Sequence, residues 1–101
     1  MKPTIQSVRF TADKKLILFI EERISKLENL FEGIIDVEVI LKLEKSDDNL
    51  NKVAEIKLQI KGGELFAKKQ CSSFEEAVDT SIDAIKSQLK KQKDKRNQAK
   101  Y

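Results

Sequence analysis

The sequence predicts an α+β fold, a single domain with the element order βαβββα. Two segments carry apolar residues at helical spacing, and three segments alternate apolar with polar residues at the period of a half-buried strand. Glycine-containing or polar turns separate these segments. A chain of 101 residues forms one domain and can bury a core without disulfide staples.

The first two elements are a short strand and an amphipathic helix. Residues 3–8 predict the strand, in which Pro3 is tolerable only at a strand start or edge. Asp13 has the chemistry of a helix N-cap, and the helix is predicted from Lys14 to Glu32. Gly33 is expected to end it in a left-handed conformation. The apolar stripe consists of Leu16, Ile20, Ile24, Leu27 and Phe31.

Three strands are predicted next, in an antiparallel meander with one dry and one wet face. A polar turn at residues 46–51 separates the first two strands, and Gly62-Gly63 is predicted to be the two-residue hairpin loop before the third. Ile40 is the one apolar residue expected on the wet face of its strand. The dry face is predicted from Ile35, Val37, Val39, Leu41, Leu43, Ala54, Ile56, Leu58, Ile60, Leu65, Ala67 and Cys71.

The last element is a second helix that begins near Phe74. Ser73 followed by Glu76 is a capping box. Little remains to be buried beyond Leu89, so the helix is expected to project past the sheet. Both helices are needed to cover the dry face, which predicts a four-stranded sheet with two helices packed on one face. The apolar stripe is Phe74, Ala77, Val78, Ser81, Ile82, Ile85 and Leu89.

Several absences argue against catalysis and against a cofactor or metal. The chain has no histidine, and its single cysteine, Cys71, is expected to be a buried apolar residue in a reducing compartment. Asp47 and Asp48 lie in a turn, where solvated acids are expected. The longest apolar run, Leu16 to Ile20, is far too short to span a membrane, and no secretion signal is visible. We therefore expect a cytoplasmic protein that is not an enzyme and has no small-molecule ligand.

Positive charge is concentrated at the C-terminal end, from about residue 86 to residue 101. These last sixteen residues hold seven basic side chains and one acidic one, whereas the rest of the chain is slightly acidic. Such a field is suited to an anionic partner, although solvated basic termini are also common. On a helix, Lys86, Lys90 and Lys93 form one stripe, and Lys91 and Lys95 lie on the opposite flank. Arg96 lies in line with the apolar stripe, beyond the point where a sheet is expected beneath it.

Arg23 and Lys26 add positive charge on the first helix. If the two helices lie side by side, these groups pool with those of the second helix in a phosphate-binding surface. Lys26 also has Glu22 as an ordinary i, i+4 partner. Phe10, Phe19, Phe31 and Phe74 are predicted to pack in or beside the core, leaving only Phe66 on the open face. Without a stacking platform, we expect recognition of backbone and shape rather than of base sequence.

The chain resembles the short ribosome hibernation promoting factors and the related ribosome-associated inhibitors. The resemblance covers essentially all of the chain, and four segments carry it. These are RISKLENLF at residues 23–31, VEVILKLEK at residues 37–45, KGGELFA at residues 61–67 and SQLKKQKDK at residues 87–95. Their order and spacing make the resemblance specific.

The resemblance implies a double-stranded-RNA-binding-like domain that binds the rRNA of the small ribosomal subunit. There it would compete with mRNA and tRNA, inhibit translation and stabilise inactive ribosomes under stress. Off the ribosome the protein is expected to be monomeric, and ribosome dimerisation would need a separate helper or would not occur. The implied RNA-binding residues are Arg23, Lys26, Lys86, Lys90, Lys91, Lys93, Lys95 and Arg96.

Two departures from the family pattern and two rival functions remain. Ala84 and Ser87 stand where some relatives are expected to have basic residues, so the rRNA contacts of this helix are expected to be shifted. The turn at residues 46–51 is longer and more acidic than expected.

The two alternative functions are a general double-stranded RNA-binding protein and a protein-interaction module whose basic helix docks on an acidic partner.

Overall fold

The computed structural model describes residues 3–45 and 48–98, with side chains described as far as Lys91. The element order is βαβββα, so the predicted fold class is confirmed. The elements are β1 (Thr4–Val8), α1 (Lys14–Leu30), β2 (Ile34–Leu43), β3 (Lys52–Ile60), β4 (Gly63–Cys71) and α2 (Phe74–Gln98).

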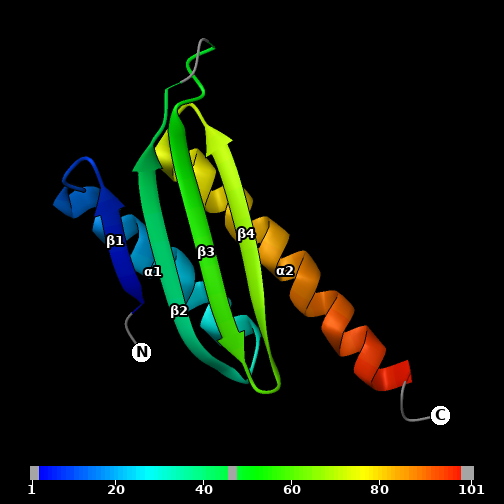
Figure 1. Cartoon of the computed structure of the whole chain (residues 1–101). Coiled ribbons are helices and arrows are strands. Elements are labelled where there is room, and N and C mark those ends of the chain that lie inside the picture. The colour runs from blue at the N-terminus through cyan, green and yellow to red at the C-terminus, as the bar shows by residue number, and fades with distance from the viewer. Residues whose placement is uncertain (1–2, 46–47, 99–101) are drawn as a thin grey trace.

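The four strands form one mixed sheet in the order β1-β2-β3-β4 (Figure 1). β2, β3 and β4 make the predicted antiparallel meander, with Val39 opposite Ile56 and Ile56 opposite Ala67. β1 pairs with β2 in parallel, because α1 carries the chain back across the sheet before β2 begins. β1 and β4 are therefore the two edge strands.

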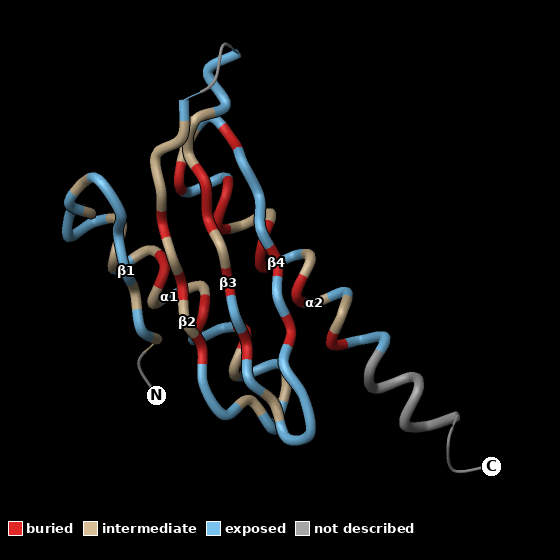
Figure 2. Tube along the Cα trace, in the orientation of Figure 1, coloured by how far each residue is buried: buried red, intermediate tan, exposed pale blue. Residues whose placement is uncertain are grey.

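Both helices cover the same face of the sheet, and the core lies between the two layers (Figure 2). From α1 the fully buried residues are Ile20, Ile24 and Leu27. Alternate residues of β2, β3 and β4 meet them, which is the period-2 pattern of a sheet with one dry face. Cys71 is buried in this core, as predicted for an apolar role.

Side-chain caps begin both helices where the sequence predicts them. The Asp13 carboxylate accepts a hydrogen bond from the backbone N–H of Leu16 at 2.8 Å. Ser73 Oγ accepts one from the N–H of Glu76 at 3.2 Å, which is the forward half of a capping box. The carboxylate of Glu76 lies 3.4 Å from the hydroxyl of Ser72, and it therefore bonds a side chain one residue before the cap.

Two predicted turns are displaced along the chain. α1 ends at Leu30, two residues before the predicted end, because the N–H of Phe31 bonds the carbonyl of Leu27 and the chain then becomes extended. Gly33 has the expected positive φ of 90°, but it serves the turn into β2. In the hairpin the loop is Lys61-Gly62 rather than Gly62-Gly63, since Gly63 already pairs with Ile60 in the sheet.

The placement of Ile35 on the dry face was wrong. Ile35 is 49% exposed, and the register between β2 and β3 shifts between Ile34 and Asp36. Such a bulge reverses which side chains face the core. Ile34 therefore packs against the core in place of Ile35.

Candidate nucleic-acid interface

The basic residues of α2 follow directly after its last core contacts. Ile85 and Leu89 are buried, whereas Lys86 is half-buried and Lys90 and Lys91 are exposed. None of these three lysines forms an ion pair with a carboxylate in the described part of the chain. Beyond them α2 continues as a helix to Gln98 and extends away from the sheet (Figure 1). The side chains of Lys93, Lys95 and Arg96 lie outside the described residues.

Two contacts fix the direction in which each flank of α2 points. Asp79 pairs with Arg23 of α1, so the flank that carries Asp79 faces α1. Lys86 lies seven residues later and Lys90 eleven, on that same flank. On the other side of α2, Gln88 bonds the edge strand β4, and Lys91 follows it by three residues. The split of the lysines between two flanks thus agrees with the sequence prediction.

Arg23 is the predicted site residue with the most defined surroundings. Its Nε donates to Asp79 Oδ1 at 2.9 Å, which joins α1 to α2. Its guanidinium carbon lies 4.5 Å from the ring centroid of Phe19, a cation–π contact one turn earlier on the same helix. An Nη1 atom is 4.0 Å from a Glu22 carboxylate oxygen. The side chain is 33% exposed, so Arg23 is both a packing residue and an accessible cation.

Lys26 is more exposed and more loosely held. Its Nζ lies 3.5 Å from the carboxylate of Glu22, the i, i+4 partner expected from the sequence. Both side chains are 63% exposed, and such surface pairs are worth about 0–1 kcal/mol. The pair with Glu22 therefore holds Lys26 only weakly.

The Arg23–Asp79 contact sets the relative position of the two basic regions. Both helices run in the same general direction across the sheet (Figure 1). Leu30, the last residue of α1, is seven residues beyond Arg23, and Lys86 is seven residues beyond Asp79. At 1.5 Å per helical residue, Lys86 lies level with the end of α1, and Lys90 and Lys91 lie beyond it. The structure therefore brings Arg23 to α2 and leaves the farther lysines on α2 alone.

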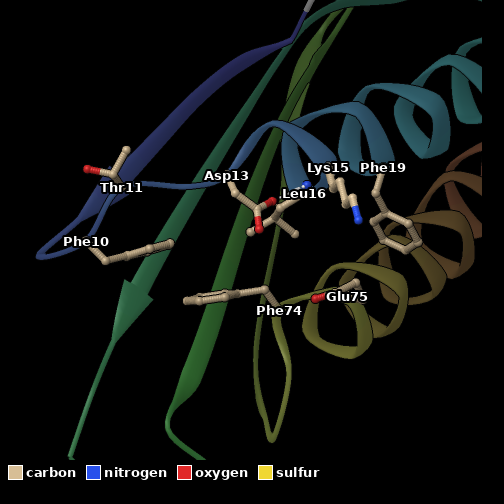
Figure 3. Close-up of a pocket in the computed structure, with 8 residues that line it drawn as sticks. All are labelled: Phe10, Thr11, Asp13, Lys15, Leu16, Phe19, Phe74 and Glu75. Carbon is tan, nitrogen blue, oxygen red and sulfur yellow. Dashed lines mark hydrogen bonds between the residues drawn. The ribbon is translucent and has the colours of Figure 1, made fainter.

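A shallow pocket of about 540 Å³ lies at the opposite end of the two helices (Figure 3). Phe10 and Phe74 stack beside it, with ring centroids 4.6 Å apart, and Asp13 on its wall is occupied as the cap of α1. Lys15 and Glu75 bring opposite charges to the lining. The pocket has no excess of positive charge, and of its lining residues Phe19 also contacts Arg23.

The open face of the sheet is a mosaic of opposite charges. Lys42 Nζ is 2.5 Å from Glu55 Oε2, and Lys68 Nζ is 4.0 Å from Glu44 Oε1. The hydrogen bond and charge of Glu55 raise the pKa of Lys42 above its ordinary value of 10.5. Phe66 is 44% exposed on this face, as predicted. Because Lys42 and Lys68 are matched by carboxylates, this face is a poorer polyanion surface than the helical side.

Asp79 and Phe19 organise Arg23, a role that was not predicted for either residue from the sequence. Phe19 lies four residues before Arg23, a spacing at which helical side chains meet, so its contact had a signal in the sequence. Asp79 is 56 residues away in the chain, and only the packing of α2 against α1 brings it there.

In the described residues, no cluster of histidine, cysteine and acidic side chains could hold a metal ion, and no helix is long and apolar enough to cross a membrane.

Two solved structures share this fold. A ribosomal subunit interface protein from Coxiella burnetii superposes with a TM-score of 0.81 at 16% identity, covering 92% of this chain and 98% of that one. The N-terminal domain of Thermus thermophilus Protein Y gives a TM-score of 0.76 at 18% identity, covering 90% and 98%. At these identities the likeness shows the fold.

The family is shown by the sequence matches. The ribosome hibernation promoting factor of Klebsiella oxytoca is 36% identical over 80 residues, which are 79% of this chain and 80% of that protein. Its namesake in Escherichia coli (strain K12) is 35% identical over the same shares of the two chains. Residues 4–97 match the family described as Sigma 54 modulation protein / S30EA ribosomal protein. The resemblance and the expectation of a non-enzymatic factor are thereby confirmed: the chain belongs to this family of ribosome hibernation factors.

Proposed function

We propose that the protein binds the rRNA of the small ribosomal subunit in the channel for mRNA and tRNA. By filling that space it inhibits translation and stabilises inactive ribosomes under stress. The names of its relatives support the ribosomal context. The place of binding and the competition with mRNA and tRNA are proposals about this chain.

One observation carries the assignment of the surface. Lys86, Lys90 and Lys91 stand on a helix that leaves the sheet, and no described carboxylate pairs with them. Ion pairs elsewhere, such as that of Lys42 with Glu55, show how this chain matches cations that belong to the fold. Cations with no carboxylate partner among the described residues are suited to phosphates, whose contacts release counterions.

The proposed interface comprises α2 from about residue 86 to its end together with the outer flank of α1. Its cations are Arg23, Lys26, Lys86, Lys90, Lys91, Lys93, Lys95 and Arg96. Such contacts fix position on a folded RNA but do not read its sequence. The shape of the channel then supplies the specificity, and no chemical turnover is needed.

The test is binding to purified small and large subunits in the presence of excess unrelated duplex RNA. The proposal predicts saturable binding to small subunits that the duplex does not displace. Complete displacement by the duplex would identify a general double-stranded RNA-binding protein instead. Binding to small subunits that survives nuclease removal of exposed rRNA would point to a protein partner.

A further inference from the structure

We propose that Asp79 and Phe19 are positioning residues that hold the guanidinium of Arg23 ready for an rRNA phosphate. This inference rests on the proposed function, because it concerns how one cation of that surface meets its ligand. It assigns to a carboxylate the role of strengthening the binding of a polyanion. The role of Asp79 is therefore opposite to the one its charge alone would give.

The contacts of Arg23 leave the Nη edge of its guanidinium accessible to a phosphate. A guanidinium has five N–H donors in a planar fork. Asp79 takes the Nε donor at 2.9 Å, and the ring of Phe19 covers one face of the group, 4.5 Å from its carbon. The Nη edge has only the weak approach of Glu22 at 4.0 Å. That edge presents two parallel donors, the arrangement that matches two oxygens of a phosphate.

Holding the side chain in advance raises its affinity for a phosphate. An arginine loses considerable rotamer freedom when it is immobilised in an interface. In this protein the Asp79 bond and the Phe19 contact restrict that freedom before a ligand binds. Arg23 is also only 33% exposed, so a phosphate beside it is partly shielded from screening ions.

Charge and position predict opposite signs for the loss of Asp79, which makes the inference testable. Replacement of Asp79 by Asn removes a negative charge from the surface, and by charge alone binding to RNA would become stronger. If Asp79 acts by positioning, binding to small subunits instead becomes about two- to tenfold weaker, since a neutral amide oxygen holds the guanidinium less firmly than a carboxylate and more of the ordering of Arg23 then falls at the moment of binding. Asp83→Asn is the matched control. It lies one turn later on α2, is exposed and has no partner among the described residues.

Two further variants separate positioning from a purely structural role of the ion pair. Phe19→Leu keeps an apolar side chain and the Arg23–Asp79 bridge between the helices, but it removes the aromatic face under the guanidinium. It should weaken binding as Asp79→Asn does, with a thermal midpoint close to that of the wild type. In an Arg23→Gln background, Asp79→Asn should no longer weaken binding.

The outcomes decide between the claims. Weaker binding by Asp79→Asn and Phe19→Leu, with unchanged or stronger binding by Asp83→Asn, supports the positioning role. Stronger binding by Asp79→Asn, equal to that of Asp83→Asn, overturns it while leaving the proposed function intact. If Asp79→Asn does not fold, wild-type affinity in a folded Phe19→Leu variant also overturns it. A wild-type protein that does not bind small subunits rejects the proposed function itself.

Discussion

Gln88 of α2 donates a hydrogen bond from its Nε2 to the carbonyl oxygen of Phe66 in β4, at 2.9 Å. β4 is an edge strand, and the unpaired backbone groups of an edge are a template for another chain. The bond occupies one of these groups near the middle of the strand. It also fastens α2 to the sheet one residue before Leu89, the last buried residue that the structure describes in this helix.

Replacement of Gln88 by Ala should therefore leave the edge of β4 more open. We expect a stability loss of at most about 1 kcal/mol, since the bond is solvent-exposed, together with a greater tendency to self-associate. Sedimentation velocity over a range of concentrations measures the second effect. Ser87→Ala, one residue earlier and exposed, is the control and should associate no more than the wild type does. Equal behaviour of the two variants would show that Gln88 does not protect the edge.

The core of α1 should account for much of the stability of the domain. Ile24→Ala removes a fully buried side chain between the helix and the sheet, and we expect a loss of about 2–5 kcal/mol in the free energy of unfolding. Leu18→Ala on the same helix is the control, because Leu18 is 56% exposed and its truncation should change stability by less than about 0.5 kcal/mol. Urea denaturation compares the two. Similar losses would contradict the assignment of the buried face.

Most of the fold could be predicted from local pattern. The periodicity of residues in α1, β3 and α2 and the caps at Asp13 and Ser73 are properties of short segments, so the sequence states them directly. The predictions were wrong where the pairing with an adjacent strand determines the local structure. Ile35 continues the alternation of β2, but the pairing of β2 with β3 forms a bulge there. Gly63 satisfies a turn as well as Gly62 does, and only the register of the hairpin distinguishes them.

The Lys42–Glu55 pair should make the domain sensitive to high pH. Its raised pKa means that Lys42 stabilises the folded state fully below about pH 10.5 and loses this contribution as the pH rises through its folded-state pKa. Lys42→Met lacks the contribution at every pH and leaves Glu55, whose side chain is only 13% exposed, without this partner. The stability difference between wild type and variant should be greater near about pH 8 than toward about pH 12.

Chemical denaturation of both proteins across this pH range makes the comparison. Working with the difference cancels the titration of groups that the two proteins share. The double variant Lys42→Met with Glu55→Leu is the control, because an apolar pair of similar volume can replace an ion pair at little loss of stability. A difference between wild type and Lys42→Met that stays constant up to about pH 12 would contradict the assignment.

The basic end of α2 should govern affinity for the ribosome. Replacing Lys90, Lys91, Lys93 and Lys95 by Gln is expected to weaken binding to small subunits strongly and to leave the thermal midpoint nearly unchanged. With about five to seven phosphates contacted, the wild-type affinity should fall by several powers of the salt concentration, and the variant should show a smaller slope. A salt titration of binding measures both effects.

A second quadruple variant tests whether position or total charge matters. In this variant Gln replaces four lysines that lie away from the proposed interface, namely Lys14, Lys15, Lys57 and Lys69. Both variants lose the same formal charge. The second should retain most of the wild-type affinity, and equal weakening by the two variants would assign binding to net charge alone.

The candidate site was less predictable than the fold. The run of lysines near the end of the chain is visible as a sequence pattern, and its division between two flanks follows from helical spacing. The environment of Arg23 is not visible in the same way, because Asp79 reaches it through tertiary packing. A basic residue can thus be recognised from sequence as a cation, whereas its geometry depends on the folded state.

The proposed binding place of this protein is the channel of mRNA and tRNA on the small subunit. Co-sedimentation with small subunits, with and without mRNA and initiator tRNA, tests it most directly. The account predicts saturable binding to small subunits that mRNA and tRNA together abolish. Binding that is unaffected by them, or equal binding to large subunits, would contradict it.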